Sequence, residues 1–207
     1  MSRRWVVFDY GKVISEPPSL DALATRLGVP EDRFAPSYWG ARQAYDHGTS
    51  DVEYWRTVGR DLGVPVSEEL AHELTGLDAE SWLRPTPEAV ELIVELAAAD
   101  VPLALLSNAP ASFGKIVSEQ PWTEHFRHLV FSGDLGVAKP SPAIWEALAA
   151  RLGTRDCVFF DDRRDNVDGA VTAGLIGVWW QGAAHARDEL VRLGLLHAKP
   201  YGHLADA

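Results

Sequence analysis

Short apolar runs, each ending in polar residues, recur along this chain of 207 residues. A run this short, bounded by Gly or polar side chains, is typical of a buried strand, because helices need longer periodic segments. Between the later runs lie helical patterns, and Thr86-Pro87 and Ser141-Pro142 each place a proline at a first helical position. Strands that alternate with helices predict an α/β fold with a doubly wound parallel sheet. The predicted strands are residues 5–9, 103–107, 129–132, 158–161 and 177–180.

The connection after the first predicted strand differs from the others, because residues 14–83 contain no strand pattern. We expect helices here at residues 19–27, 51–62 and 67–74, the second of them opened by a capping box that starts at Ser50. A structureless loop of this length is unusual in a compact domain. We therefore predict a small helical cap at residues 16–83, inserted into a core of residues 1–15 and 84–207, and a loose tail after Leu196.

Composition narrows the classes of function. The hydrophobic fraction of 46% suffices for a buried core, and the net charge of −11 disfavours a surface for nucleic acid or anionic membrane, which needs clustered Lys and Arg. A single cysteine, Cys157, excludes an intrachain disulfide, and the apolar run around it predicts a buried structural thiol. Because no apolar stretch has membrane-spanning length and no signal-peptide pattern is present, we expect a soluble, cytoplasmic protein.

Two of the predicted strands end in carboxylates. Asp9 closes the first, two residues before Gly11, at the strand tip where open α/β sheets place their chemistry. Such a carboxylate is a metal ligand, a nucleophile or the cap of the next turn. Asp161 and Asp162 close the fourth run, and adjacent like charges repel unless a cation is present, which favours a divalent ion with oxygen ligands. Capping of the following helix is the structural alternative.

Polar residues that suit an anion follow the second and third predicted strands. Ser107 and Asn108 stand at a strand tip, where both side chains can donate hydrogen bonds to an anion or form a local turn instead. Lys139 precedes Pro140, which restricts it to an extended backbone and would aim its ammonium group. An ordinary solvated lysine is the alternative at this position.

In order and spacing, these four segments together resemble the haloacid dehalogenase (HAD) superfamily, and the resemblance covers essentially the whole chain. The insertion after the first strand is similar to the superfamily's C1 cap, the mark of its subfamily I. Two segments most resemble the sugar-phosphate phosphatase branch, which includes α-glucose-1-phosphatase. They are Phe8-Asp9-Tyr10-Gly11-Lys12-Val13 and Phe159-Phe160-Asp161-Asp162-Arg163-Arg164-Asp165-Asn166-Val167.

The resemblance implies a hydrolase that acts on a small phosphate ester. Asp9 would attack phosphorus and form an aspartyl-phosphate, and Lys139 would balance the charge between Asp9 and the phosphoryl group. Ser107 and Asn108 would hold phosphate oxygens. In the cap, Arg42 lies among aromatic residues at near-helical spacing, and we expect it to contact a sugar or a second anion.

The same resemblance implies Mg²⁺ as the cofactor. The ion would be held by the carboxylate of Asp9, the backbone carbonyl of Gly11 and the carboxylate of Asp162. Asp161 would serve as a further ligand, directly or through water. Asn166 matches a position that steadies the surroundings of the metal.

Gly11 is a departure from the superfamily's phosphatase motif, which carries a second Asp here as general acid and base. Such assistance is worth ~10²–10⁴-fold, although the sugar-phosphatase branch also lacks this Asp. Because 2-haloacid dehalogenases lack it too, a dehalogenase-type hydrolase is an alternative, but these enzymes need no metal and have no reason for paired aspartates. A catalytically weak, phosphate-binding regulatory protein is a second alternative. The natural substrate and the oligomeric state stay open.

Overall fold

The computed structural model describes residues 4–198, so most of the tail after Leu196 lies outside the described residues. The strands are β1 (Trp5–Phe8), β2 (Leu103–Ser107), β3 (His128–Phe131), β4 (Cys157–Asp161) and β5 (Ile176–Trp179). The helices are α1 (Asp21–Leu27), α2 (Glu31–Asp46), α3 (Asp51–Leu62), α4 (Glu68–Trp82), α5 (Pro87–Ala98), α6 (Ala111–Ser118), the 3₁₀ helix η1 (Pro121–His125), α7 (Ser132–Leu135), α8 (Pro142–Leu152), α9 (Arg164–Thr172) and α10 (Ala183–Arg192).

The five strands form one parallel sheet in the order β3-β2-β1-β4-β5, which confirms the predicted doubly wound α/β fold. All five predicted strands are present, and their bounds differ from the prediction by one residue at most. β1 lies in the middle of the sheet, with Val6 opposite Leu103 of β2 and Val158 of β4. Because parallel strands end at one edge of a sheet, the residues that follow β1, β2 and β4 meet there.

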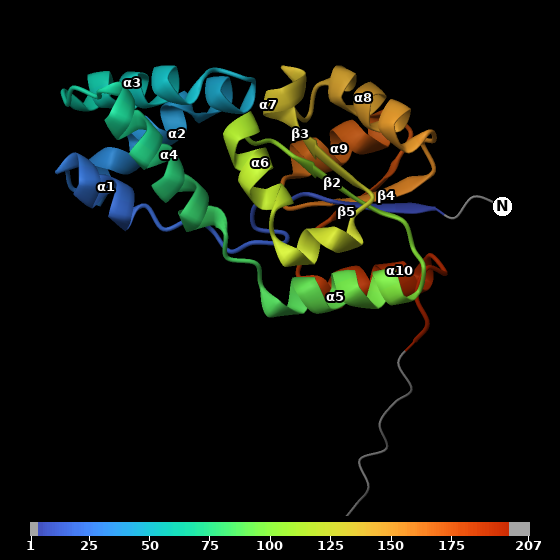
Figure 1. Cartoon of the computed structure of the whole chain (residues 1–207). Helices are drawn as coiled ribbons and strands as arrows, with labels where there is room; N and C mark the ends of the chain where they lie inside the picture. The colour runs from blue at the N-terminus through green and yellow to red at the C-terminus, as the bar shows by residue number, and fades with distance from the viewer. Residues whose placement is uncertain (1–3, 199–207) are drawn as a thin grey trace, which may run out of the picture.

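Helices cover both faces of the sheet (Figure 1). Successive side chains of a strand point to opposite faces. Val6 and Phe8 of β1 therefore pack in one hydrophobic core with α5 and α10, whereas Trp5 and Val7 pack in another with α8 and α9. Strands that are buried on both faces are apolar throughout, which explains why they were recognisable as short continuous runs.

Between β1 and α5 the chain forms four helices, α1–α4, which we call the helical insertion; it lies to one side of the sheet (Figure 1). The insertion has a hydrophobic core of its own, in which Phe34, Tyr38 and Trp55 are fully buried. Ser50 caps α3 by accepting a hydrogen bond from the backbone N–H of Glu53, in agreement with the predicted capping box. The insertion is thus a packed helical unit and not a loop.

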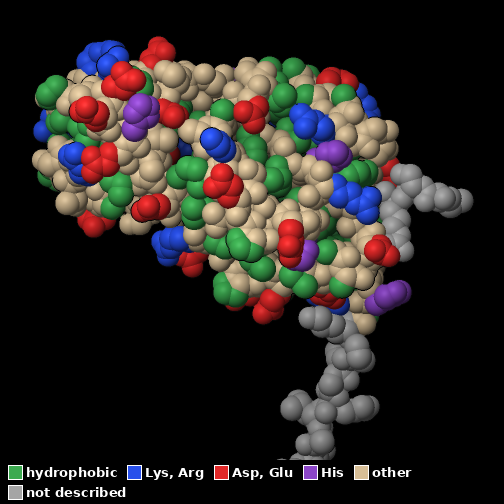
Figure 2. Space-filling view, in the orientation of Figure 1, with side chains coloured by type: hydrophobic (Ala, Val, Ile, Leu, Met, Phe, Trp, Pro, Cys, Tyr) green, Lys and Arg blue, Asp and Glu red, His purple; other side chains and the backbone are tan. Residues whose placement is uncertain are grey.

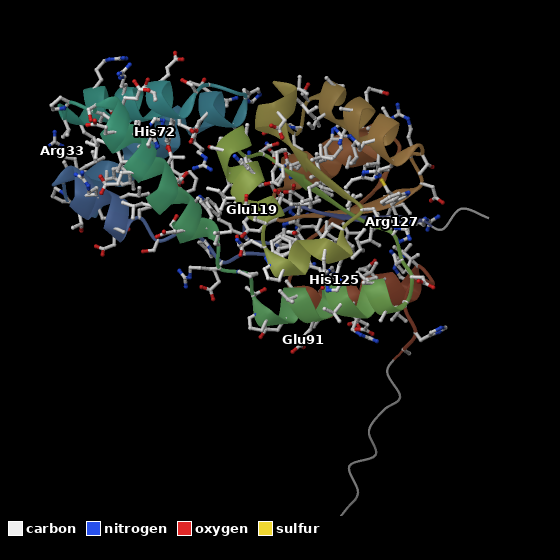
Figure 3. The ribbon with its side chains drawn as sticks, viewed as in Figure 1. Arg33, His72, Glu91, Glu119, His125 and Arg127 are labelled. Atoms are coloured by element: carbon white, nitrogen blue, oxygen red, sulfur yellow. The ribbon has the colours of Figure 1, made fainter. Side chains whose placement is uncertain are left out.

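The prediction lacks one helix of the insertion, α2, and gives another, α4, too short. α2 has near-helical spacing of its aromatic residues, but no side-chain cap marks its start and Pro36 lies inside it. α4 continues past residue 74 to Trp82. Arg33 of α2 lies at the outer end of the insertion (Figure 3), where its guanidinium donates to the carbonyl of Leu62 at 2.8 Å. Packing among the helices therefore decides these lengths where local signals are weak.

The surface carries both signs of charge. Acidic and basic side chains are interspersed over the face shown in Figure 2. Within residues 4–198, the large hydrophobic side chains that are most exposed are Trp39, Val94 and Val171. Over the same range, no helix combines the length and the apolar character that crossing a membrane requires.

Candidate active site

Lys139 is the centre of an ion cluster at the carboxyl edge of the sheet. Its Nζ donates hydrogen bonds to Asp9 Oδ1 at 2.7 Å, to Asp161 Oδ2 at 2.7 Å and to the backbone carbonyl of Leu106 at 2.9 Å. An ammonium group has three protons, so these contacts use all of them. The ends of β1, β2 and β4 each supply one partner, and in this way the structure brings together Asp9, Lys139 and Asp161, which are far apart in the sequence.

Burial dominates the electrostatics of this cluster. It raises the pKa of Asp9 to about 7, with Lys139 opposing the shift and Asp161 adding to it. Burial would lower the pKa of Lys139, but Asp9 and Asp161 outweigh it and raise that pKa above its ordinary value. Burial and Asp161 also raise the pKa of Asp162. One ammonium among three carboxylates leaves an excess of negative charge, which a bound cation would relieve.

The cluster offers ligands that fit a hard divalent cation. One carboxylate oxygen each of Asp9, Asp161 and Asp162 lie within 4.8 Å of one another. Asn166 is 2% exposed, and its Oδ1 is buried with no hydrogen-bond partner among the described residues. Buried acceptors without a partner are rare and call for an explanation. Oxygen donors of this kind are those that Mg²⁺ prefers, so a hydrated cation explains both observations.

Asp161 and Asp162 differ in the way their oxygens are used. Both oxygens of Asp161 accept hydrogen bonds, from Lys139, from the Asn166 amide and from the backbone N–H of Arg163. The side chain of Asp162 is half-buried and has no hydrogen-bond partner within residues 4–198. Asp161 therefore fixes Lys139 and Asn166, while Asp162 presents an open carboxylate.

Ser107 and Asn108 both stand at the end of β2, but their side chains have different partners. Ser107 Oγ has no hydrogen-bond partner in the described part of the chain and can donate to an anion. The Asn108 amide donates from Nδ2 to the carbonyl of Lys139 and accepts at Oδ1 from the N–H of Lys139, each at 2.9 Å. Asn108 thus holds the Lys139 backbone in place, and the second proton of its Nδ2 is left for the phosphate contact predicted for it.

Gly11 lies beneath a tryptophan of the insertion. A Cβ at Gly11 would be 3.1 Å from Cζ3 of Trp82, so the indole covers the position of the acid that the sequence lacks. Trp82 is held in place by two hydrogen bonds: its Nε1 donates to Tyr38 Oη at 3.1 Å, and its carbonyl accepts from Tyr10 Oη at 2.8 Å. The neighbouring Lys12 is exposed and has a left-handed backbone, with φ 61°.

A second buried cation, Arg42 of α2, belongs to the insertion. Its Nε donates to Asp46 Oδ1 at 2.9 Å, and its Nη1 donates to Asp78 Oδ2 at 3.0 Å and to Tyr38 Oη at 2.5 Å. Burial would lower the pKa of Arg42, but Asp78, Tyr38 and Asp46 outweigh it and raise that pKa. The guanidinium carbon lies 5.8 Å from the ring centre of Trp82, within the range of a cation–π contact. Nη2 has no partner among the described residues.

Residues around Lys139 and residues around Arg42 line one cavity of about 250 Å³. Every residue that the sequence predicts for the site lines it, except Asp161, which is fully buried behind Lys139. From the sheet part of the chain come Asp9, Gly11, Ser107, Asn108, Lys139, Asp162 and Asn166; from the insertion come Trp39, Arg42, Asp46 and Trp82.

Sequence reasoning did not assign Asp46, Trp82, Tyr10 or Phe113 to the cavity. Asp46 follows Arg42 by four residues, a spacing that places two side chains on one face of a helix. This spacing is the sequence feature from which Asp46 could have been assigned to the cavity. Trp82 carries no such signal, because its position depends on how α4 packs within the insertion.

The sequence is similar to those of known hydrolases. Residues 16–174 match the family model for haloacid dehalogenase-like hydrolases. A phosphatase of Mycobacterium tuberculosis is 27% identical over 144 residues, which cover 68% of this chain and 65% of that protein, less than two thirds of its length. A phosphoglycolate phosphatase of Yersinia pestis is 29% identical over 183 residues, which cover 83% of this chain and 78% of that protein.

Solved structures share the fold. A HAD family enzyme of Bacteroides thetaiotaomicron, in complex with magnesium and inorganic phosphate, has a TM-score of 0.69 at 16% identity and covers 99% of this chain and 100% of that one. An L-2-haloacid dehalogenase of Xanthobacter autotrophicus with covalently bound chloropropionic acid has a TM-score of 0.67 at 19% identity. The match covers 94% of this chain and 85% of that one. Both likenesses concern the fold alone. The family model, however, spans the chain from the start of the insertion to the helix after β4, and the chain therefore belongs to the haloacid dehalogenase-like hydrolase family.

Proposed function

We propose that this chain is a Mg²⁺-dependent phosphatase that hydrolyses a small phosphomonoester through an aspartyl-phosphate intermediate. The observation that carries the proposal is the arrangement of Asp9, Lys139, Ser107 and Asp162 around one cavity. These residues supply a nucleophile, a fixed positive charge, an open hydroxyl group and a carboxylate for a metal. Phosphoryl transfer needs alignment and charge neutralisation of this kind more than it needs other covalent chemistry.

Asp9 is the nucleophile in this proposal. Lys139 fixes one of its oxygens at 2.7 Å, and a carboxylate oxygen attacks phosphorus while the ester P–O bond breaks. Water then attacks the phosphorus of the aspartyl-phosphate, which releases phosphate and restores the carboxylate. Lys139 offsets the negative charge between Asp9 and the phosphoryl group, and Ser107 donates a hydrogen bond to a phosphate oxygen.

We assign the metal to the same edge of the sheet. Mg²⁺, when bound, supplies positive charge to the phosphate and orients the substrate. Asp9, the backbone carbonyl of Gly11 and Asp162 would hold it, and the buried Oδ1 of Asn166 would face its hydration shell. Asp161 takes part by fixing Lys139 and Asn166, with which its oxygens are already hydrogen-bonded.

The helical insertion acts as a cap in this proposal, over residues 16–83, on a core of residues 1–15 and 84–207. Ser112 Oγ of α6 donates to Asp51 at 2.7 Å, and Ser132 Oγ of α7 donates to the backbone carbonyl of Asp46. The insertion therefore rests against the sheet part of the chain near the cavity. A wall of this kind excludes water and selects the substrate.

A sugar phosphate is the substrate class that we favour. The cavity of about 250 Å³ is smaller than the ~300–1,000 Å³ common for drug-sized ligands, which suits a small leaving group. Its insertion wall presents the indoles of Trp39 and Trp82, against which the apolar face of a sugar ring can pack, and the polar groups of Arg42 and Asp46 for hydroxyl groups. The resemblance of both aspartate motifs to the branch that includes α-glucose-1-phosphatase supports the same class. A cytoplasmic location stays a prediction.

A dehalogenase-type hydrolase is the second candidate. Gly11 leaves no acid beside Asp9, and a dehalogenase shares the fold. In that reaction water attacks the carbonyl carbon of the ester, so it gives no reason for a metal site. The open carboxylate of Asp162 and the unpartnered Oδ1 of Asn166 favour the phosphatase. No comparable observation favours a catalytically weak, phosphate-binding regulatory protein.

Phosphate release from a panel of sugar phosphates, with Mg²⁺ and with EDTA, tests this function. We expect release to need Mg²⁺ and to fall on the order of 10⁴-fold or more in Asp9→Asn, because an amide does not attack phosphorus. Asp168→Asn, an exposed position on α9, is the matched control and should keep its activity. Release that survives EDTA or Asp9→Asn would contradict the proposal. If no ester releases phosphate, chloride release from 2-haloacids tests the second candidate.

A further inference from the structure

The departing oxygen of a sugar phosphate needs a proton that position 11 does not supply. On the phosphate side of the cavity, Asp9, Lys139 and Asp162 already have roles in the proposed function, on which this inference rests. The opposite wall carries two charged groups, Arg42 and Asp46. A guanidinium does not release its protons in proteins, so Asp46 is the one carboxyl group on the side of the cavity where the leaving group would lie.

Asp46 is fixed, and one of its oxygens is open. Oδ1 accepts a hydrogen bond from Arg42 Nε at 2.9 Å, whereas Oδ2 has no partner among the described residues and is not among the buried unpartnered atoms. The side chain is 16% exposed and lines the cavity. The backbone carbonyl of Asp46 accepts from Ser132 Oγ of α7, which ties this end of α2 to the sheet part of the chain. Oδ2 can therefore present a proton to a bound ester.

Charges around Asp46 keep this proton available. Burial raises the pKa of Asp46 to about 6, with Arg42 opposing the shift, Asp78 of α4 adding to it and His47 opposing it. The same cavity is also lined by the cations Lys12, Lys139 and Arg163 and by the carboxylates Asp9 and Asp162. An acid works best when its pKa is close to the working pH, because it then holds a proton and still gives it up readily.

Two other titratable side chains of the cavity are less suited. Lys12 is exposed and has no hydrogen bond to any described residue that would fix its ammonium group. Tyr10 Oη donates its proton to the carbonyl of Trp82 at 2.8 Å, and burial raises the pKa of Tyr10 far above neutrality.

We propose that Asp46, on the wall formed by the insertion, is the general acid and base that replaces the missing aspartate. As Asp9 forms its bond to phosphorus and the ester P–O bond breaks, the leaving oxygen takes the proton from Asp46 Oδ2. The alcohol departs, and Asp46 is left as a carboxylate beside Arg42. When water attacks the aspartyl-phosphate, Asp46 takes one proton from it, the bond between phosphorus and Asp9 breaks, and both carboxyl groups return to their starting states.

The test compares esters whose leaving groups differ in acidity. The wild type, Asp46→Asn and Asp78→Asn are assayed with Mg²⁺ for kcat/KM on a series of aryl phosphates and on the best sugar phosphate of the panel. Asn keeps an oxygen that can accept from Arg42 but has no proton to transfer. Asp78 is the matched control, because it also binds Arg42, at 3.0 Å, but does not line the cavity.

For Asp46→Asn we expect a loss of ~10²–10⁴-fold with the sugar phosphate and of less than about tenfold with p-nitrophenyl phosphate, whose leaving group needs no proton. The dependence of kcat/KM on the acidity of the leaving group should be steeper in Asp46→Asn than in the wild type. In Asp78→Asn this dependence should be the same as in the wild type. With the sugar phosphate, kcat/KM of the wild type should also decline on the alkaline side of its pH optimum, where Asp46 loses its proton, and Asp46→Asn should flatten this decline.

Equal losses of Asp46→Asn across the series would overturn the assignment of the acid and would leave the phosphatase intact, provided that Asp9→Asn abolishes release in the same assay. If kcat/KM depends more steeply on leaving-group acidity in both Asp46→Asn and Asp78→Asn, the effect comes from the position of Arg42, which both carboxylates hold. This result would also overturn the assignment of Asp46 as the acid. If the wild type releases phosphate from no ester, the proposed function fails, and the role of Asp46 fails with it. Circular dichroism of each variant identifies loss of fold as the cause of lost activity.

Discussion

Two buried cations line the cavity from opposite walls, and they are held in different ways. Lys139 gives all three of its protons to groups at the ends of β1, β2 and β4, so it is fixed by the sheet and has none left for a ligand. Arg42 lies between Asp46 and Asp78 on helices, and its Nη2 has no partner among the described residues. Lys139 is therefore a preformed electrostatic centre whose protons are all taken up by the protein, whereas Arg42 keeps an open nitrogen that a substrate can bind.

This difference matches the division of labour in the proposed reaction. Attack on phosphorus gains from groups that do not reorganise, because preorganised charges stabilise the transition state without further movement. Selection of the leaving group instead needs polar atoms that are free until the substrate arrives. Both walls use a buried ion pair, and the two cations differ in whether the protein itself takes up all of their protons.

Removal of Lys139 should have the largest effect. Lys139→Met leaves Asp9 and Asp161 buried without their counter-charge, and breaking a buried pair from one side typically destabilises a protein by ~3–5 kcal/mol. We expect a loss of this order in urea unfolding and no measurable phosphate release. Lys115→Met, at an exposed position of α6, is the control and should be close to neutral. A stable Lys139→Met protein with normal turnover would refute the preformed centre.

The titration of Asp46 should appear in the stability of the protein. Its pKa is raised from 3.8 to about 6 in the folded state, so the folded protein binds this proton more tightly than the unfolded chain. Its contribution to stability is thus present at low pH and is lost as pH rises from about 4 to about 6, by up to about 3 kcal/mol. Urea unfolding across this range, in EDTA, should show a larger loss in the wild type than in Asp46→Asn, in which the raised pKa values of Asp9 and Asp162 still contribute a loss. Parallel curves for the two proteins would contradict the burial of this carboxyl group.

A side chain at Gly11 should have a smaller effect. In Gly11→Ala the new Cβ would lie 3.1 Å from Trp82, so the indole must shift by a few tenths of an ångström. We expect a loss of about 1 kcal/mol in thermal unfolding, typical of mild overpacking. Gly76→Ala is the control, because a Cβ there meets nothing within 4 Å and Ala favours the helix, so it should stabilise the protein. A stabilising Gly11→Ala would show that Trp82 does not cover this position.

The two walls also differ in how far the sequence predicts them. Asp9, Ser107 and Asp161 each end a short apolar run, and the rule that parallel strands end at one edge brings them together without further information. Asp46 and Trp82 stand at the ends of α2 and α4, and their approach to the sheet depends on the packing of four helices against one another. Local patterns contain no measure of that packing, which is why the sheet wall was predictable and most of the insertion wall was not.

Asn108 illustrates a further limit. Its place at the end of β2 follows from the sequence, but its hydrogen bonds to the Lys139 backbone join residues that are 31 positions apart. A strand-tip position predicts that a polar side chain faces the active edge, and it does not predict whether a ligand or the protein itself takes up the hydrogen bonds.

The most direct test of the central claim is a single turnover of a sugar phosphate in heavy-oxygen water, with Mg²⁺ and with protein in excess, followed by mass spectrometry. Attack of water on phosphorus puts the heavy oxygen into the released phosphate and leaves the peptide that contains Asp9 unlabelled, and this is the result that we predict. Heavy oxygen in the carboxylate of Asp9 would show attack on the carbonyl carbon, as in a dehalogenase, and would contradict the account.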